Sequence, residues 1–103
     1  MPLLTDELRA RLPPLHAQEA EEEPWVYACL YLAGTPWRWY VFEGEPEGED
    51  FVFFGFVFGL SDEFRHFRLS ELESIRSLLG KSVERDESFT EGRLTDVVPA
   101  PDS

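Results

Sequence analysis

The residues whose types could do chemistry are two histidines and one cysteine, and their spacing does not favour catalysis. His16 and His66 belong to no His-x-x-x-His pair and stand beside no Cys-x-x-Cys motif, so the common zinc patterns are missing. Cys29 lies among apolar residues, where a thiol is usually buried and unreactive. His66 alternates with Phe64 and Arg68 and is the one candidate general base, although a lone strand histidine is more often packed or exposed. The sequence therefore predicts no catalytic residue, no metal site and no cofactor.

Other polar and aromatic side chains offer a recognition surface rather than a reactive one. Trp37 and Trp39 alternate with Arg38 and Tyr40, which places the two tryptophans on one strand face and the other pair on the opposite face. Arginine beside aromatic rings can stack nucleic-acid bases, but the usual basic groove is missing, and two core tryptophans are the simpler interpretation. The charges after Val83 can salt-bridge to arginines of the sheet or form a polar patch. We predict a recognition surface composed of Arg38, Tyr40, His66, Arg68, Glu84, Arg85 and Asp86.

Composition indicates one small acidic domain. The 103 residues are 43% hydrophobic and 15% aromatic, which suits a single α+β domain over residues 1–98 with a flexible tail at 99–103. Twenty-one acidic against 9 basic residues give a net charge of −12, which disfavours direct binding to nucleic acid or to an anionic membrane. The single cysteine and the missing signal-peptide pattern predict a cytoplasmic protein. The acidic run at residues 43–50 lacks the residue order of a calcium-binding loop and is predicted to be a solvated loop.

The elements that must position these residues follow from periodicity and turn signals. A short helix is expected near residues 5–12, with Thr5 as its N-cap and with Leu8 and Leu12 on one face. Strand-like runs at 25–34, 36–43, 51–60 and 63–69 have short links, which predicts a four-stranded antiparallel meander. A second helix is expected at 71–79, and an edge strand is expected around Val83. Ser70 is the predicted N-cap of the second helix, and Gly80 is the predicted C-cap of that helix.

The run FVFFGFVFGL at residues 51–60 is predicted to be a central strand buried on both faces, and it is too short to cross a membrane as a helix. One face carries Phe54, Phe56 and Phe58, which are expected to pack together and to meet Ile75 or Leu78 of the second helix. The other face, with Phe51, Phe53 and Val57, is left to the first helix, the tail or a second subunit. A homodimer or a protein partner at an aromatic sheet face and a three-layer monomer both stay open.

Five segments in series carry a resemblance to a known family. They are LLTDELRARLPPL, WRWY, FFGFVFGL, HFRLSELESIR and GKSVERD, and in this order and spacing they resemble the bacterial family called domain of unknown function 2958. That family often has a Gly-Tyr-Phe step before its Ser-x-x-Glu helix, where this chain has Arg65-His66-Phe67. The resemblance implies carriage on plasmids and other mobile elements, and it implies no activity and no catalytic residues.

The sequence favours a non-enzymatic protein-interaction module that uses an aromatic sheet face. The basis is an excess of apolar strand surface over the helix surface available to cover it. An acidic DNA mimic that blocks a nucleic-acid enzyme is the alternative, based on the net charge and on the acidic runs at 19–23 and 43–50. A small enzyme without a recognisable motif is the second alternative.

Overall fold

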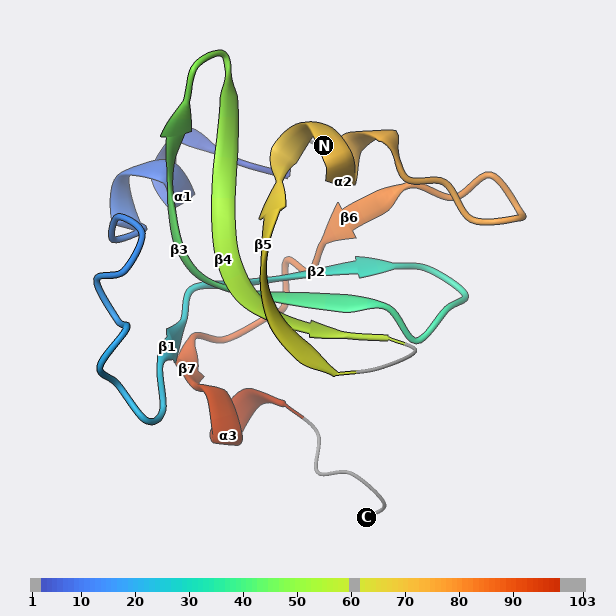
Figure 1. The fold of residues 1–103 in the computed structure, drawn as a ribbon. Coiled ribbons are helices and arrows are strands. Elements are labelled where there is room, and N and C mark those ends of the chain that lie inside the picture. Colours follow the sequence, from blue (N-terminus) through green and yellow to red (C-terminus); the bar gives the residue numbers. More distant parts are fainter. Residues whose placement is uncertain (1–2, 60–61, 99–103) are drawn as a thin grey trace.

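A computed structural model describes residues 3–59 and 62–98, and the chain forms a mainly β structure with three short helices there. Five strands make one antiparallel sheet in the order β5-β4-β3-β2-β6, while β1 and β7 pair separately (Figure 1). The elements in chain order are α1 (Asp6–Arg11), β1 (Trp25–Val26), β2 (Ala28–Leu32), β3 (Arg38–Glu47), β4 (Asp50–Phe58), β5 (Glu63–Arg68), α2 (Leu69–Ser74), β6 (Val83–Arg85), β7 (Gly92–Arg93) and α3 (Leu94–Val97).

The antiparallel meander is confirmed, because β2, β3, β4 and β5 pair in sequence order. The count of four strands is wrong. The segment 25–34 is divided into β1 and β2 at Tyr27, whose N–H donates to the carbonyl of Val41. The predicted edge strand at Val83 is β6, and it extends the main sheet beside β2 as a fifth strand. A three-residue strand is too short to show a period of two in sequence.

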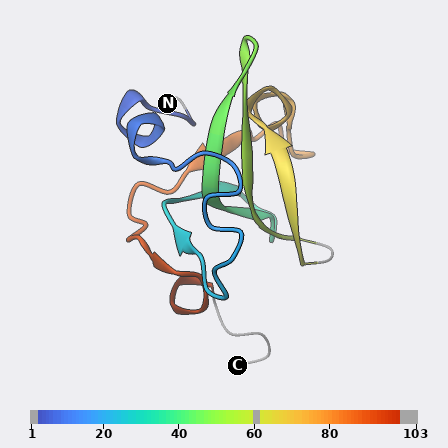
Figure 2. The ribbon, with the colours of Figure 1, turned by 60° about the vertical axis from the view of Figure 1, so that its left-hand side comes forward.

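The first helix forms as predicted. The N–H of Leu8 donates to Oγ1 of Thr5 at 3.1 Å, which satisfies one of the amides that a helix start leaves without a partner. Leu8 and Leu12 are both buried. The segment that follows α1 then passes alongside the sheet toward β1 (Figure 2).

The second helix differs from the prediction in its start and its length. It begins two residues earlier, with the N–H of the N-cap residue Arg68 donating to Oε1 of Glu71 at 3.0 Å. Ser70 does not cap it, because Asp50 binds both the hydroxyl and the N–H of Ser70, at 2.5 and 3.1 Å. The helix then ends at Ser74 rather than at residue 79.

Local hydrogen bonds explain the early end of α2. The Arg76 guanidinium donates to the carbonyls of Glu73 and Ile75, both at 2.7 Å, so these groups are satisfied without another helical turn. The chain then forms a loop in which Gly80 adopts a φ of +79°. Leu78 and Leu79 lie on this loop and are fully or largely exposed, at 106% and 83%. The expected contact of Leu78 with the phenylalanines of β4 is therefore wrong.

The sheet has two differently covered faces. We call the first the helix face, because α1 and α2 pack on it. We call the second the tail face, because β1 and the C-terminal segment pack on it. The helix face carries Leu8, Leu12, Leu30, Leu32, Trp39, Val41, Phe51, Phe53, Val57, Phe67 and Leu72. The tail face carries Val26, Cys29, Tyr40 and Phe42, against which Phe54, Phe56, Phe58, Phe89, Leu94, Val97 and Val98 pack.

The prediction of which face the second helix covers is wrong. Phe54, Phe56 and Phe58 do share a face, but it is the tail face, and all three are only partly buried. Ile75 packs against the helix-face cluster, and Phe53 of that cluster is 1% exposed. Because α2 follows β5 without a linker, the geometry of this junction decides the face it covers. Leu60, Ser61 and the predicted tail at 99–103 lie outside the described residues.

Candidate functional site

A β-bulge in β3 shapes the tail face beside β4. The pairing of β3 with β4 shifts between Val41 and Glu43, so Phe42 is an additional residue in its strand. Glu43 pairs with Phe54, and the Phe42 ring also contacts Phe54, at 6.1 Å between centroids. The bulge thus places an aromatic ring and a carboxylate side by side, and both are buried.

The buried carboxylate of Glu43 holds the segment between α1 and β1 against the sheet. One oxygen accepts the N–H of His16 at 2.8 Å, and the other accepts the N–H of Gln18 at 2.7 Å. Glu45 accepts the N–H of Leu15 at 2.9 Å. The hydrogen bonds to Glu43 offset the free-energy cost of burying its charge, because a buried carboxylate is tolerated only when it is well hydrogen-bonded.

The side chain of Gln18 fastens the end of the same segment. Its amide nitrogen donates to the carbonyls of Trp25 and Phe42, both at 3.0 Å. Its amide oxygen accepts the N–H of Trp25 at 2.6 Å. The segment 15–25 therefore has a fixed position beside the tail face.

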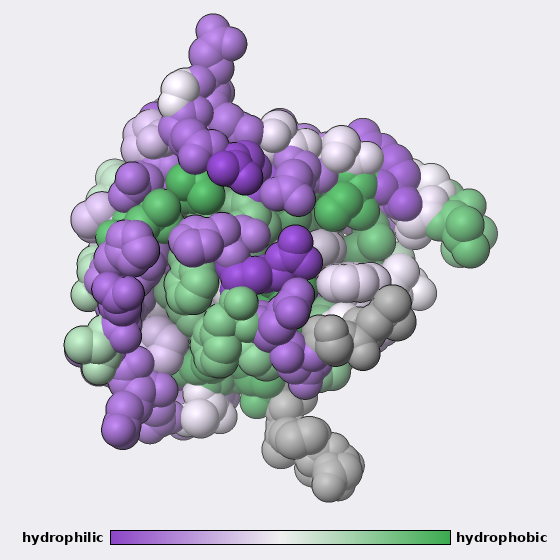
Figure 3. Space-filling view, viewed as in Figure 1, coloured by the Kyte–Doolittle hydropathy of each residue, from purple (hydrophilic) through white to green (hydrophobic). Residues whose placement is uncertain are grey.

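A groove of about 290 Å³ lies between this segment and strand β5, and we call it the aromatic groove. Phe42, Phe54, Phe64 and His66 form its aromatic side. Its other side carries Glu43 and the segment residues His16, Gln18, Glu19, Glu21, Glu22 and Pro24. Figure 3 shows an apolar area near the centre of the view, bordered by hydrophilic side chains.

The rings of the aromatic groove form a connected ladder across three strands. Phe64 of β5 contacts Phe42 and Phe56, at 5.9 and 5.2 Å between centroids. The His66 ring lies 4.8 Å from that of Phe54. Phe64 is nevertheless 55% exposed, although phenylalanine is among the side chains most often buried. The ladder therefore presents rings in fixed positions to solvent.

The predicted recognition residues mostly share the tail face but do not converge. Arg38 and Tyr40 of β3 pair with Phe58 and Phe56 of β4, so they lie on this face. His66 and Arg68 of β5 pair with Phe54 and Val52 of β4, so they lie on it too. Glu84 pairs with Tyr31, which pairs with Arg38, so it lies on the same face. Arg85 pairs with Leu30 and faces the other way. Of the seven, only His66 lines the aromatic groove.

Three of the other predicted residues have structural partners. Arg38 lies over the ring of Tyr31 at 5.7 Å. Arg68 binds Glu47 at 2.6 Å, and this hydrogen bond lowers the pKa of the Glu47 carboxyl. Asp86 donates its backbone N–H to the carbonyl of Cys29 and accepts the N–H of Ser88, which turns the chain after β6.

The buried polar groups under the tail face are not poised for nucleophilic chemistry. Burial raises the pKa of the Cys29 thiol to about 11, although the nearby Arg38 opposes the shift. Burial and the neighbouring Cys29 raise the pKa of Tyr40 to about 12. Both groups are therefore protonated near neutral pH, and a protonated thiol is a weak nucleophile.

The acidic run at 43–50 is not a solvated loop as predicted, because it belongs to a long β-hairpin. Glu47 pairs with Asp50 across a tight turn in which Gly48 has a φ of +60°. Gly48 and Pro46 are typical turn residues, so the sequence predicts a loop where β3 continues. Pro46 is nevertheless part of β3.

The aromatic groove itself was not predicted. Phe42, Phe54 and Phe64 fall in the predicted strands, and Glu19, Glu21 and Glu22 fall in the acidic run at 19–23. The bulge in β3 brings these residues together, but it produces no recognisable pattern in the sequence. The pairing register of β3 with β4 cannot be deduced from composition either. The one local signal in the sequence was the alternation of Phe64 and His66 in the predicted fourth strand, and the structure shows that Phe64 is exposed.

The described residues contain neither a metal-binding cluster nor a membrane-spanning helix. Within residues 3–59 and 62–98, no three His, Cys, Asp or Glu side chains are grouped so that they could hold a metal ion. No helix in that part of the chain is long and apolar enough to cross a membrane.

Comparison with known proteins assigns a family but no activity. No curated protein and no solved structure matches this chain. The family described as "Protein of unknown function (DUF2958)" matches residues 3–98, which include every helix and strand given above. The chain therefore belongs to the DUF2958 family of proteins of unknown function.

Proposed function

We propose that this protein is a non-enzymatic binding module whose aromatic groove takes an extended, basic segment of a partner protein. The observation that carries the proposal is the half-exposed Phe64 in a ladder of fixed rings, next to a wall of carboxylates. Exposed aromatic rings in fixed positions are typical of interaction surfaces, because their burial against a partner costs little conformational entropy.

The charge of the wall favours a basic partner. Glu19, Glu21 and Glu22 are exposed along the groove, and the whole chain carries a net charge of −12. A segment with lysine or arginine beside apolar side chains could place its cations at the wall and its apolar groups on the rings. A second copy of this chain would bring like charges together, so the charge disfavours a homodimer through this groove.

The hydrogen bonding of the second acidic run gives less support to a DNA mimic. Such a mimic needs carboxylates that face outward with phosphate-like spacing. Glu43 and Glu45 instead bind backbone amides, Glu47 binds Arg68, and Asp50 binds Ser70. The exposed charge near the groove is then concentrated in the first run, at residues 19–23.

Binding of synthetic peptides tests the proposal. A short peptide of alternating lysine and phenylalanine should bind, with affinity that falls as salt rises, because the charges at the wall are solvent-exposed. A glutamate–phenylalanine peptide and a lysine–serine peptide should bind much more weakly. Equal binding of all three peptides would refute the proposal.

Matched variants locate the binding. Phe64→Ser should weaken the lysine–phenylalanine peptide by about tenfold through loss of apolar contact, whereas Leu78→Ser, an exposed apolar change elsewhere, should not. Glu19→Gln combined with Glu22→Gln should reduce both affinity and salt dependence, while Glu73→Gln on α2 serves as the charge control. An unaltered affinity in the Phe64 variant would place the peptide somewhere else.

A further inference from the structure

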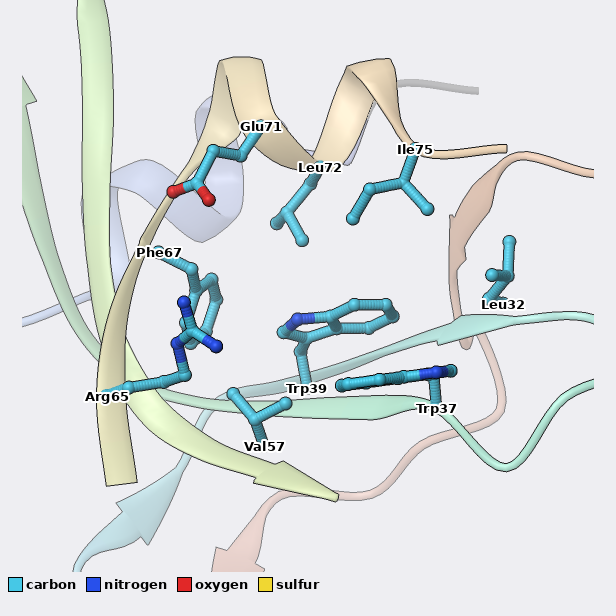
Figure 4. A pocket seen from close by; sticks show the side chains of 9 residues that line it. All are labelled: Leu32, Trp37, Trp39, Val57, Arg65, Phe67, Glu71, Leu72 and Ile75. Atoms are coloured by element: carbon cyan, nitrogen blue, oxygen red, sulfur yellow. The ribbon is translucent and has the colours of Figure 1, made fainter. Parts of the chain in front are cut away.

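A second cavity, of about 260 Å³, opens on the helix face between α2 and the sheet, and we call it the tryptophan pocket (Figure 4). It is separate from the aromatic groove and shares no residue with it. Its lining residues are Leu32, Trp37, Trp39, Val57, Arg65, Phe67, Glu71, Leu72 and Ile75.

The pocket has a flat aromatic side and an aliphatic side. The rings of Trp37 and Trp39 are stacked, with centroids 5.8 Å apart and planes 21° from parallel. Leu72 and Ile75 of α2 face these rings across the cavity (Figure 4). Trp39 and Leu72 are themselves buried, so the accessible apolar lining consists of the partly buried Trp37 and Ile75. A planar ring could contact these two side chains.

The tryptophan rings are held in place by the neighbouring backbone. A Cβ atom added at Gly59 would lie 2.5 Å from carbon atoms of the Trp37 ring, so only glycine allows the indole to lie against this strand. The backbone amide N–H of Trp37 also donates to Oγ1 of Thr35 at 3.1 Å. A preformed site of this kind loses little entropy when a ligand binds.

One side of the pocket carries a charge of each sign. Arg65 from β5 and Glu71 from α2 both lie near Phe67, and their charged groups face the same part of the cavity (Figure 4). Within the described residues, Arg65 forms its ion pair with Glu63, at 3.4 Å, and not with Glu71. Oε1 of Glu71 accepts the N–H of Arg68, which leaves Oε2 available to a ligand.

We infer that the tryptophan pocket binds a free aromatic amino acid. The ring would lie against Trp37 and Ile75, the ammonium group would face Glu71, and the carboxylate would face Arg65. This ligand matches the apolar lining and both charges at once. It is also neutral overall, and a net charge of −12 on the protein repels ligands that are anionic overall.

Nuclear magnetic resonance of the full chain gives a direct readout, with L-phenylalanine as the probe. The chain has three tryptophans, and Trp25 lies outside the pocket with its indole N–H bonded to Glu91. Addition of L-phenylalanine should shift the indole signals of Trp37 and Trp39 and leave that of Trp25 unchanged. The expected dissociation constant is on the order of 0.1–1 mM, as is usual for so small a ligand.

Analogues that lack one charge, combined with variants that lack its partner, test the orientation. N-acetylphenylalanine and phenylalaninamide should each bind about tenfold more weakly than phenylalanine, because each loses one charge-assisted hydrogen bond. Glu71→Gln should weaken phenylalanine similarly but leave N-acetylphenylalanine unchanged, and the amide oxygen can still cap α2. Arg65→Gln should weaken phenylalanine but leave phenylalaninamide unchanged.

Two results would overturn the inference. The first is no shift of the Trp37 and Trp39 indole signals at about 10 mM phenylalanine, a concentration well above the expected dissociation constant. The second is equal binding of the two analogues and phenylalanine. The Glu73→Gln variant, which changes an exposed charge of the same helix outside the pocket, should bind phenylalanine as the unmodified chain does.

Discussion

Removal of the Glu43 carboxylate should release the segment that forms the acidic wall of the aromatic groove. In Glu43→Ala the amides of His16 and Gln18 lose acceptors at 2.8 and 2.7 Å. A hydrogen bond to a charged group contributes about 1.5–3 kcal/mol, so the two together set an upper range of roughly 3–6 kcal/mol. Both bonds are only partly buried, and water can replace part of each one. We therefore expect a loss of about 2–4 kcal/mol in the free energy of unfolding.

Two measurements check this expectation. Urea denaturation gives the change in unfolding free energy, and amide hydrogen exchange shows whether His16 and Gln18 become unprotected in the folded state. Glu43→Gln keeps one acceptor oxygen and should cost less than Glu43→Ala. If Glu43→Ala changed neither the stability nor the exchange of these amides, the carboxylate would not be what holds the segment.

Three further perturbations separate core from surface. Phe53→Ala should destabilise the fold by about 3–5 kcal/mol in urea denaturation, because this ring is buried. Phe64→Ala should cost less than about 1 kcal/mol, because this ring is half exposed. Similar losses for the two variants would contradict the assignment of the two faces. Gly55→Ala should prevent folding, as judged by circular dichroism, because its Cβ would lie 1.9 Å from the carbonyl oxygen of Tyr40; a folded variant would show that β3 and β4 do not approach this closely. The thiol of Cys29 should react slowly with a disulfide reagent at pH 8 and fast only after unfolding, because burial raises its pKa to about 11; fast reaction in the folded state would contradict its burial.

Much of the sheet could be predicted because strand patterns and turns are local signals. The paired strands from β2 to β5 follow from runs of aromatic and β-branched residues between short links. The alternation of Trp37 and Trp39 with Arg38 and Tyr40 correctly divides these residues between the two faces. The Thr5 cap follows from the preference of helix starts for a hydroxyl acceptor.

The errors at the second helix come from side-chain hydrogen bonds that periodicity does not reveal. Asp50, which is distant in the chain, binds Ser70 and removes it from the cap position. The nearby Arg76 binds the carbonyls at the end of α2. A sequence pattern shows a good capping residue but not a better partner that approaches from another strand. The face covered by α2 likewise depends on the junction at Arg68, which periodicity does not describe.

The candidate sites were the hardest part to predict for the same reason. His66 was identified by its type, but the rings beside it come from β3, β4 and β5 and meet only through the bulge at Phe42. The tryptophan pocket needs Gly59 beside Trp37, a packing relation that the sequence does not indicate.

The most direct test of the proposed function is to map the lysine–phenylalanine peptide on the protein by chemical-shift changes of backbone amides. The account predicts that the largest changes fall on Phe42, Phe54, Phe64 and His66 and on the segment 16–24, and that they weaken as salt is added. Shifts scattered over all acidic surfaces, or centred on the tryptophan pocket, would contradict the assignment of the aromatic groove as the binding site.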